Sequence, residues 1–395
     1  MFPKKALPLL AVLAFVLVSC SGTTPTESPT QSTSDAGPDG APSVTIDDAG
    51  AVARSPLTPV TVHAANAKLT GVSVTNTATS AAVSGSLDSQ GTTWTSGEPL
   101  GYGSTYQIVA HANGDNGKPV DRRATISTLS PRAQAEPQLI PAPDSTAATG
   151  VGIGQPIVFQ FTQPVRDKAG VEKRLTVTSA PAQEGGWYWM DDEHVHYRPK
   201  EYWRPGTTLT VSAKIYGIDF GAGVYGSADR TETYRVHDSW IAKADGNTAS
   251  MTIFHNGEQV KSMPISMGKE ATPTHLGAHV ISSKEASYTM DSCTYGVCPG
   301  DPEYYRSEER WSLRISNDGE FVHENPSSVA EQGSSNVSHG CINLNAENAR
   351  WFFDHFDLGD VVEVTNSGGP PLPVWDTYGD WSLSWPEWQA GSAVH

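Results

Sequence analysis

Hydrophobic and polar positions alternate in short runs through the middle of the chain, and turn residues separate these runs. Runs of this kind include TYQIVAHANG, RATISTL and PIVFQFTQPV. Strands that recur about every ten residues, with Gly, Asn and Asp between them, are typical of β-sandwiches. We therefore predict a mostly β fold class, with two immunoglobulin-like modules at residues 44–131 and 135–238.

A third unit is predicted over residues 239–366, and it combines strands with one helix. The runs SMTIFH and EQVKSMPISMG flank Asn256-Gly257, the dipeptide most typical of a type I′ hairpin. Later, apolar residues recur at helical spacing between Asn345, a good N-cap residue, and Gly359, a residue type that commonly ends helices. We expect a hairpin at the start of this unit and a short helix near its end.

The N-terminal residues are expected to direct the protein out of the cytoplasm. Residues 1–20 carry two lysines and an apolar run that is shorter than the about 20 residues of a transmembrane helix. The run ends in Leu17-Val18-Ser19-Cys20, which resembles a bacterial lipobox. We expect lipidated Cys20 to anchor the protein to the outer face of the cell membrane, and an ordinary signal peptide with an incidental cysteine is the alternative.

Two further segments differ in composition from the modules. Residues 21–43 are rich in Ser, Thr, Pro and Gly and poor in large apolar side chains, which predicts a flexible tether. Residues 367–395 form a C-terminal extension that contains four tryptophans. Because exposing so many aromatic rings is unfavourable, we expect the extension to pack on the third unit or on the second module.

The charge of the chain excludes some partners. With 26 Lys and Arg against 43 Asp and Glu, the formal net charge is −17. No basic stripe is present to neutralise phosphates, so nucleic acid is not expected as a partner, and an anionic membrane surface is equally disfavoured.

Two motifs in the modules have the composition of functional sites. His194 and His196 lie beside acidic residues, but no third metal ligand follows at a recognisable spacing, so we interpret them as solvated polar residues of a turn and a strand. The glycine-rich stretches at 150–154 and 221–226 lack the strand and helix of a nucleotide site and are interpreted as turns. Neither module carries chemistry of its own on this interpretation.

The cysteines indicate where chemistry could occur. Cys293 and Cys298 lie five positions apart in a loop and are expected to form a disulfide outside the cell, while a zinc site lacks two further ligands nearby. Cys341 is then a free thiol, next to Gly340 and with His323 available. A nucleophile and a buried structural cysteine are both consistent with this residue alone.

The surroundings of Cys341 resemble a known family. The resemblance is carried by a motif, an upstream histidine and a loop: Ser338-His339-Gly340-Cys341-Ile342-Asn343, His323, and Thr272, Pro273 and Gly277. These residues are similar to the catalytic domain of bacterial L,D-transpeptidases, which crosslink peptidoglycan. The order of lipobox, tether, two immunoglobulin-like modules and catalytic domain resembles the multidomain lipoproteins of that family. It implies a β-rich catalytic domain with a short helix over 239–366.

The resemblance also implies a two-step acyl transfer. Cys341 would attack the carbonyl between meso-diaminopimelate and the terminal D-Ala of a tetrapeptide stem, and the diaminopimelate amine of a second stem would take the acyl group in a 3→3 crosslink. His323 would move protons, and the main-chain carbonyl of Glu324 would orient its ring. N–H groups of Gly340 and Cys341 would stabilise the oxyanion, and Ser338 and His339 complete the motif, with His339 shaping the turn.

By the same resemblance, a lid over the substrate maps to residues 290–311. The expected substrate-binding residues are Met290, Tyr295, Tyr305 and Trp311 in the lid and Asp318, Gly319 and Asn343 at the border of the site. Glu324 stands where relatives often have a small polar residue, and its carboxylate is expected to affect the neighbouring base. The pair Cys293 and Cys298 would stiffen the lid.

The implied partners are peptidoglycan stem peptides, as tetrapeptide donor and diaminopimelate acceptor, with β-lactams of the carbapenem class as inhibitors. No cofactor and no metal are expected. Two alternatives stay open: an L,D-carboxypeptidase that uses water as the acceptor, and a non-catalytic wall-binding lipoprotein.

Overall fold

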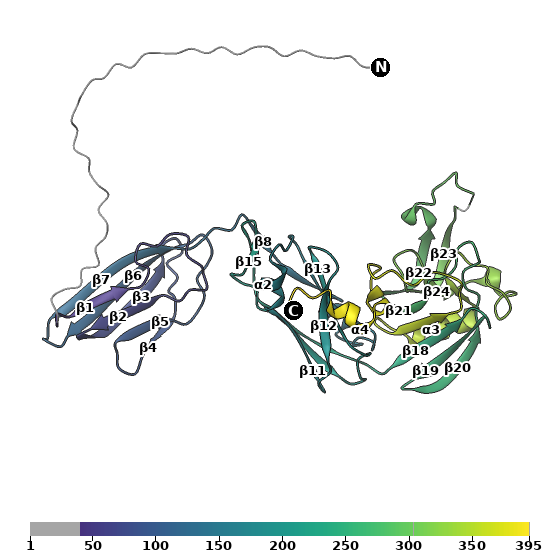
Figure 1. The fold of residues 1–395 in the computed structure, drawn as a ribbon, viewed down its shortest axis with the longest axis horizontal. Coiled ribbons are helices and arrows are strands. Elements are labelled where there is room, and N and C mark those ends of the chain that lie inside the picture. The colour runs from purple at the N-terminus through teal and green to yellow at the C-terminus, as the bar shows by residue number, and fades with distance from the viewer. Residues whose placement is uncertain (1–39, 303, 395) are drawn as a thin grey trace, which may run out of the picture.

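The computed structural model describes residues 40–302 and 304–394 and arranges them as three β-rich bodies in a row (Figure 1). The predicted signal peptide with Cys20, and the tether up to residue 39, lie outside the described residues. Within the described ranges, no helix is long and apolar enough to cross a membrane. The mostly β fold class is confirmed by the sheets of all three bodies.

The first body, module 1, packs the four-stranded sheet β1-β2-β5-β4 against the three-stranded sheet β3-β6-β7. Its strands alternate as the sequence predicts: in β6 the side chains of Tyr106, Ile108 and Ala110 are buried. They pack in one core with Trp94 of the opposite sheet. The strands are β1 (Ser43–Ile46), β2 (Thr61–Ala65), β3 (Ala67–Asn76), β4 (Gly85–Leu87), β5 (Thr93–Ser96), β6 (Thr105–Gly114) and β7 (Pro119–Ser127).

The second body, module 2, is a larger sandwich with a more aromatic core. Its sheets have the orders β12-β13-β10-β9, β11-β14-β17 and β15-β16-β8. Phe159, Phe161 and Trp203 are buried in its core, and β10 is apolar at every position except Gln160. The elements are β8 (Ala133–Ala135), β9 (Pro137–Ile140), α1 (Pro143–Thr146), β10 (Ile157–Phe161), α2 (Lys168–Glu172), β11 (Leu175–Ala180), β12 (Gly185–Trp189), β13 (His194–Pro199), β14 (Thr208–Ala213), β15 (Asp219–Gly221), β16 (Val224–Gly226) and β17 (Arg230–Arg235).

The third body is the domain that contains Cys341. A five-stranded sheet, β20-β19-β18-β26-β21, and a four-stranded sheet, β22-β23-β24-β25, share one hydrophobic core with α3. The elements are β18 (Trp240–Asp245), β19 (Ser250–His255), β20 (Glu258–Pro264), β21 (Gly277–Val280), β22 (Ser283–Asp291), η1 (Ser292–Tyr295), β23 (Arg306–Arg314), β24 (Phe321–Glu324), η2 (Pro326–Ser328), β25 (Ile342–Leu344), α3 (Ala346–His355) and β26 (Val361–Thr365).

Local signals placed the hairpin and the start of the helix correctly. Asn256 and Gly257 have φ angles of 50° and 86°, as a type I′ turn between β19 and β20 requires. The side chain of Asn345 caps α3 by accepting a hydrogen bond from the N–H of Asn348 at 2.9 Å. Both predictions are therefore confirmed.

The prediction that Gly359 ends this helix is wrong. Helix α3 stops at His355 because Phe356 is already extended. Gly359 instead lies at the contact with module 2, where its carbonyl accepts a hydrogen bond from the N–H of Gly154 at 2.9 Å. A Cβ on Gly359 would lie 2.6 Å from the nitrogen of Gly152, so close approach of two backbones requires glycine here.

The C-terminal extension returns from the third body to module 2 (Figure 1). It contains η3 (Gly379–Ser382) and α4 (Trp385–Gln389), and α4 lies against β12. The indole N–H groups of Trp381 and Trp388 donate to the carbonyls of Gly154 and Gly186 at 2.8 and 2.9 Å. The predicted packing of the extension is confirmed for these two rings, whereas Trp375 is 66% exposed.

The extension also corrects the interpretation of one histidine in module 2. His194 pairs with Asp191 near the surface, as expected for a polar turn. His196 is not solvated: it is buried, and its Nδ1 lies 2.8 Å from the Asp380 carboxylate of the extension. Its partner is 184 positions away, so nothing in the local sequence indicated this contact.

Candidate active site

Cys341 is one of the residues that line a pocket of about 440 Å³. The residue is 5% exposed, and its Sγ lies 3.5 Å from the main-chain oxygen of Gly319. Among the described residues it is the free cysteine. A buried thiol that lines a pocket is accessible to a ligand and largely shielded from bulk solvent.

Backbone hydrogen bonds hold the turn that carries Cys341. The hydroxyl of Ser338 donates to the Cys341 carbonyl at 2.6 Å, and that of Thr274 donates to the Gly340 carbonyl at 2.7 Å. Gly340 has a φ of 123°, a conformation that side chains other than glycine rarely adopt. The predicted TP-x-x-x-G loop, which contains Thr274, thus supports the motif directly.

The turn alters one expectation about the oxyanion donors. The N–H of Gly340 donates to the hydroxyl of Ser338 at 3.1 Å. An N–H group carries one proton, so this donor is already engaged in the structure. Of the two predicted donors, the N–H of Cys341 is the better candidate.

His323 lies on β24, directly beside the strand that follows Cys341. Strands β24 and β25 are parallel, with His323 opposite Asn343. The ring is 3% exposed, and its Nδ1 lies 2.7 Å from the main-chain oxygen of Glu324. Because a carbonyl can only accept, Nδ1 carries a proton in this arrangement. The expectation that the Glu324 carbonyl orients the ring is confirmed.

A carboxylate, which the sequence did not indicate, also faces the Nδ1 of His323. The Oε2 of Glu309 on β23 lies 3.5 Å from the Nδ1 of His323. The Glu324 carboxylate is directed elsewhere, with its Oε2 3.8 Å from the Nε of Arg310. The acidic neighbour of the imidazole is therefore Glu309, a residue that strand pairing brings to the site.

These contacts determine the charge of the histidine. Burial lowers the pKa of His323, but hydrogen bonding and charge interactions with Cys341 and Glu309 outweigh burial and raise the pKa to about 10. Burial raises the pKa of Glu309, but its hydrogen bonds with His323 and Ser307 reverse the effect and lower it. An imidazolium beside a carboxylate and a sulfur is the favoured state.

Several of the predicted substrate-binding residues line the same pocket. Met290, Tyr305 and Asn343 are among its lining residues, as are the motif residues Ser338 and His339. The Asn343 amide donates to the Ser328 hydroxyl at 3.1 Å. The ring of His339 lies against that of Tyr305, and its Nε2 is 3.2 Å from the Nζ of Lys269. His339 is thus placed at the rim, away from the thiol's proton partner.

Other predicted residues lie elsewhere. Trp311 does not line the pocket: its ring packs against Phe353 of α3, with the Arg350 guanidinium 4.3 Å from its centroid, so our placement of this residue is corrected. Asp318 is exposed and is not a lining residue, whereas Gly319 reaches the site through its carbonyl. The side chain of Tyr295 lies outside what the structure describes.

A buried ionic network supports the turn from behind. Oε1 of Glu320 accepts hydrogen bonds from the main-chain N–H and Nδ1 of His275, both at 2.9 Å, and its Oε2 is 3.3 Å from the Nε2 of His279. Burial raises the pKa of Glu320, but hydrogen bonds from the two histidines outweigh it and lower the pKa to about 2. Sequence reasoning missed this network because Glu320 lies about 40 positions after His275 and His279 in the chain.

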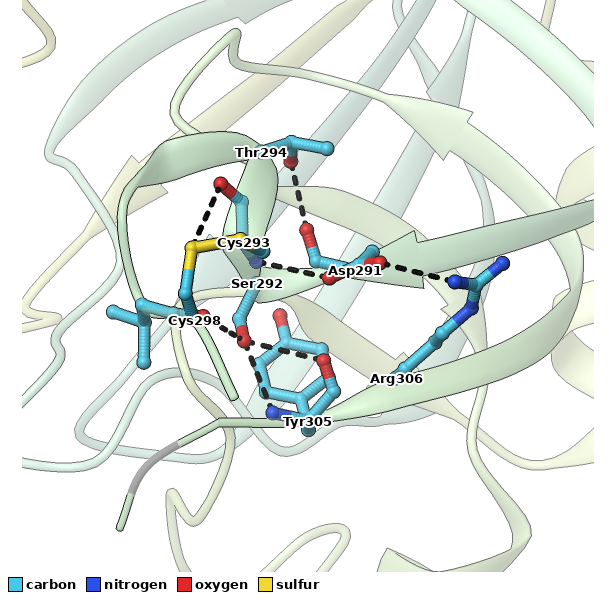
Figure 2. The surroundings of a disulfide bond; sticks show 8 residues. Asp291, Ser292, Cys293, Thr294, Cys298, Tyr305 and Arg306 are labelled. Atoms are coloured by element: carbon cyan, nitrogen blue, oxygen red, sulfur yellow. Dashed lines mark hydrogen bonds and ion pairs between the residues drawn. A yellow bond between two sulfur atoms is a disulfide. The ribbon is translucent and has the colours of Figure 1, made fainter. Parts of the chain in front are cut away.

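The predicted disulfide is confirmed (Figure 2). Cys293 and Cys298 enclose a short loop after β22, so the sulfurs are not available for zinc. The hydroxyl of Ser292 accepts from the N–H of Tyr305 at 3.0 Å and donates to the carbonyl of Val297 at 2.8 Å. The crosslinked loop therefore positions the backbone of Tyr305, a residue that lines the pocket.

Comparisons with known proteins agree with this site. Residues 240–364 match the family described as the L,D-transpeptidase catalytic domain, and residues 51–219 match the bacterial Ig domain. L,D-transpeptidase 2 of Mycobacterium tuberculosis (strain CDC 1551 / Oshkosh) is 39% identical over 90% of this chain and 83% of that protein. L,D-transpeptidase 5 of Mycobacterium tuberculosis (strain ATCC 25618 / H37Rv) is 35% identical over 96% and 82%.

A solved structure is also similar to this chain. The structure of LD transpeptidase LdtMt1 in complex with imipenem shares 33% identity with this chain at a TM-score of 0.50. The match covers 58% of this chain and 99% of that one.

Proposed function

The chain belongs to the L,D-transpeptidase family, and from that premise we propose that it forms 3→3 crosslinks between peptidoglycan stem peptides through a thioester on Cys341. One observation carries the proposal. One pocket is lined by the free thiol of Cys341 and the buried imidazole of His323, and this imidazole bonds to the carbonyl of Glu324. The three groups match a nucleophile, its base and the group that orients the base.

In the first step the Cys341 thiolate attacks the carbonyl carbon that joins the L-centre of meso-diaminopimelate to the terminal D-Ala of a tetrapeptide. A C–S bond forms and the C–N bond breaks. The proton that left the thiol is held on His323 and passes to the departing amine, so D-Ala leaves as a neutral amine. The oxyanion of the tetrahedral intermediate accepts a hydrogen bond from the N–H of Cys341.

In the second step the side-chain amine of another stem's diaminopimelate attacks the thioester. A C–N bond forms, the C–S bond breaks, and the amine proton returns to His323. The thiolate and imidazolium are thereby regenerated. Met290, Tyr305 and Asn343 line the pocket in which the acyl donor is proposed to lie.

We also propose that β-lactams of the carbapenem class acylate the same sulfur. Opening of the lactam forms a C–S bond, breaks the ring C–N bond and leaves a proton on that nitrogen. The similar LD transpeptidase LdtMt1 has been solved in complex with imipenem, which supports the proposal. The 440 Å³ pocket that Cys341 lines has room for a compound of this size.

Anchoring at the outer face of the cell membrane through lipidated Cys20 is part of the proposal. The apolar run that ends in Leu17-Val18-Ser19-Cys20 supports it, as does the polar composition of the residues that follow. A lipid at Cys20 and a tether at 21–43 would let the catalytic domain reach the wall.

The test follows protein and products together. The full chain and its Cys341→Ala variant are each incubated with a disaccharide tetrapeptide bearing meso-diaminopimelate, and both protein and solution are analysed by mass spectrometry. We expect an acyl adduct on the wild type only, with a crosslinked dimer in solution. Tripeptide without dimer would indicate hydrolysis, and the absence of both adduct and product, with the thiol kept reduced, would contradict an enzymatic role.

A further inference from the structure

Glu309 contributes a negative charge to the pocket at a precise point. Its side chain is 16% exposed, and its Oε2 lies 3.5 Å from the Nδ1 of His323, which is itself 4% exposed. The same nitrogen lies 2.7 Å from the Glu324 carbonyl. The ring nitrogen that faces away from the reaction is therefore shared by a neutral acceptor and a charged one.

Strand pairing explains why Glu309 reaches the site. On β23, Ser307 and Glu309 are two positions apart and point to the same face of the sheet. Met290 on β22 lies directly opposite Ser307. All three line the pocket, so the carboxylate is built into the wall formed by the lid strands.

The two acceptors act differently on the imidazole. A carbonyl fixes the tautomer and the orientation of the ring with little preference for its charge. A carboxylate within about 4–6 Å favours the protonated ring through charge. Glu309 therefore adds what the main-chain carbonyl cannot supply.

We propose that Glu309 is a positioning residue of the reaction, which holds His323 as the imidazolium while the Cys341 thiolate waits for the acyl donor. The inference rests on the proposed function, because it assigns Glu309 to the proton path of that reaction. With Glu309 in place, the leaving D-Ala amine meets a proton donor that is already charged. The thiolate–imidazolium pair should therefore persist to higher pH with Glu309 than without it.

The other ionisable groups around the imidazole are compatible with this role. Cys341 supplies the sulfur on the reacting side, and His339 and Glu331 also line the pocket. On its own strand, the Glu324 carboxylate is beside the Arg310 guanidinium, which offsets its charge. Helix α3 packs on β24 through Ala349 and Phe352, which are apolar. Of the acidic neighbours, Glu309 is the one whose carboxylate is paired with the ring.

The test uses iodoacetate, an anion whose reaction with a thiolate is favoured beside an imidazolium. The full chain is alkylated across a pH series, and modification of the Cys341 peptide is followed by mass spectrometry. At the alkaline end of the series the rate should fall as the imidazolium loses its proton. Replacing Glu309 by Gln should move the falling limb to lower pH by about 1–3 units. At a pH just below the wild-type limb, the variant should therefore be alkylated about tenfold or more slowly than the wild type.

Two comparison variants separate charge from shape. Glu309→Asp keeps the charge, so its falling limb should coincide with that of the wild type. Glu308→Gln removes the neighbouring charge, which bonds to Ser287, and should leave the falling limb where it is. Should the Gln variant fail to fold, Glu309→Met gives a second uncharged side chain of similar length. Coincident falling limbs in wild type and the uncharged variant would overturn the proposal, as would an equal shift in Glu308→Gln or Glu309→Asp.

Alkylation does not require transpeptidation, so the two proposals fail separately. A shifted limb in a protein that makes no crosslinked dimer would support the role of Glu309 and contradict the proposed function. A crosslinking enzyme whose limb does not shift would contradict the role of Glu309 alone.

Discussion

The imidazole of His196 and the carboxylate of Asp380 meet at 2.8 Å in a buried contact that ties module 2 to the C-terminal extension. Arg198, two positions along the same strand, lies 4.7 Å from the centroids of both Trp381 and Trp388. The extension also reaches the catalytic domain, where Asp376 accepts from the N–H of Asn317 at 2.8 Å. One segment thus joins the two bodies and supports the turn whose Gly319 carbonyl contacts the thiol.

Removing one partner of the buried contact should destabilise the protein. Asp380→Ala leaves His196 buried without its acceptor, and we expect the free energy of unfolding to fall by about 1–3 kcal/mol. His194→Ala, which removes the exposed pair with Asp191, should cost no more than about 1 kcal/mol. Urea unfolding of the three proteins provides the comparison, and equal losses for both variants would contradict the importance of the buried pair.

Replacing Gly340 by alanine should lower both the stability of the protein and the rate of acylation. At a φ of 123°, and with a Cβ 3.4 Å from the Glu320 side chain, alanine should displace the turn before Cys341. We expect a loss of about 1–3 kcal/mol in stability and a much larger loss in the rate of acylation.

The matched control for Gly340 is Gly257→Ala in the β19–β20 hairpin. Gly257 has a φ of 86° and open space around its Cβ position, far from the site in sequence. This variant should lose a similar amount of stability and keep its rate of acylation. Calorimetry and intact-mass acylation kinetics measure the two effects, and normal acylation by Gly340→Ala would contradict the prediction.

The Glu320 network predicts acid sensitivity. The pKa of Glu320 is lowered in the folded protein from 4.5 to about 2, so its contribution to stability is present above pH 4.5 and is lost as the pH falls towards 2. Because the carboxylate is buried, the contribution is of the order of 3 kcal/mol. Glu320→Gln should flatten this part of the stability profile. Unfolding measured at several pH values between 2 and 5 checks it, and parallel profiles for the two proteins would rule it out.

Breaking the lid disulfide should affect catalysis more than stability. Cys293 and Cys298 are only five positions apart, so the bond restricts the unfolded chain little. Removing it should lower the free energy of unfolding by at most about 2 kcal/mol. Because the loop bonds to the backbone of Tyr305, the double Ser variant should acylate more slowly. Reduction of the wild type should have the same effect. Unchanged turnover together with an unchanged melting temperature would count against a role for the disulfide in the lid.

Residues whose roles depend on near neighbours were predictable from the sequence. Asn256-Gly257 specifies its turn through its own φ angles, and Asn345 caps a helix that begins at the next residue. Cys293 and Cys298 are close enough along the chain for a disulfide to form without help from the rest of the fold. The motif at Cys341 indicated the chemistry because its members are consecutive.

Residues whose roles depend on pairing between distant segments were not predictable in this way. An aromatic residue such as Trp311 fits a pocket or a core equally well, and contact with α3 decided for the core. Gly359 is indistinguishable in sequence from a helix terminator, yet it serves a contact between two bodies. Glu308 and Glu309 are the same residue type, and only the pairing of β23 with β24, the strand that carries His323, places Glu309 beside the imidazole.

Short-range spacing and residue chemistry were enough to predict the β-rich class, the hairpin, the helix start, the disulfide and the family that the catalytic motif resembles. The tertiary structure alone decided the charge on His323, the partner of His196 and the path of the C-terminal extension. Each of these follows from carboxylates and rings that approach within a few ångströms only after sheets have paired, and electrostatic interactions depend on that distance and on burial rather than on separation along the chain.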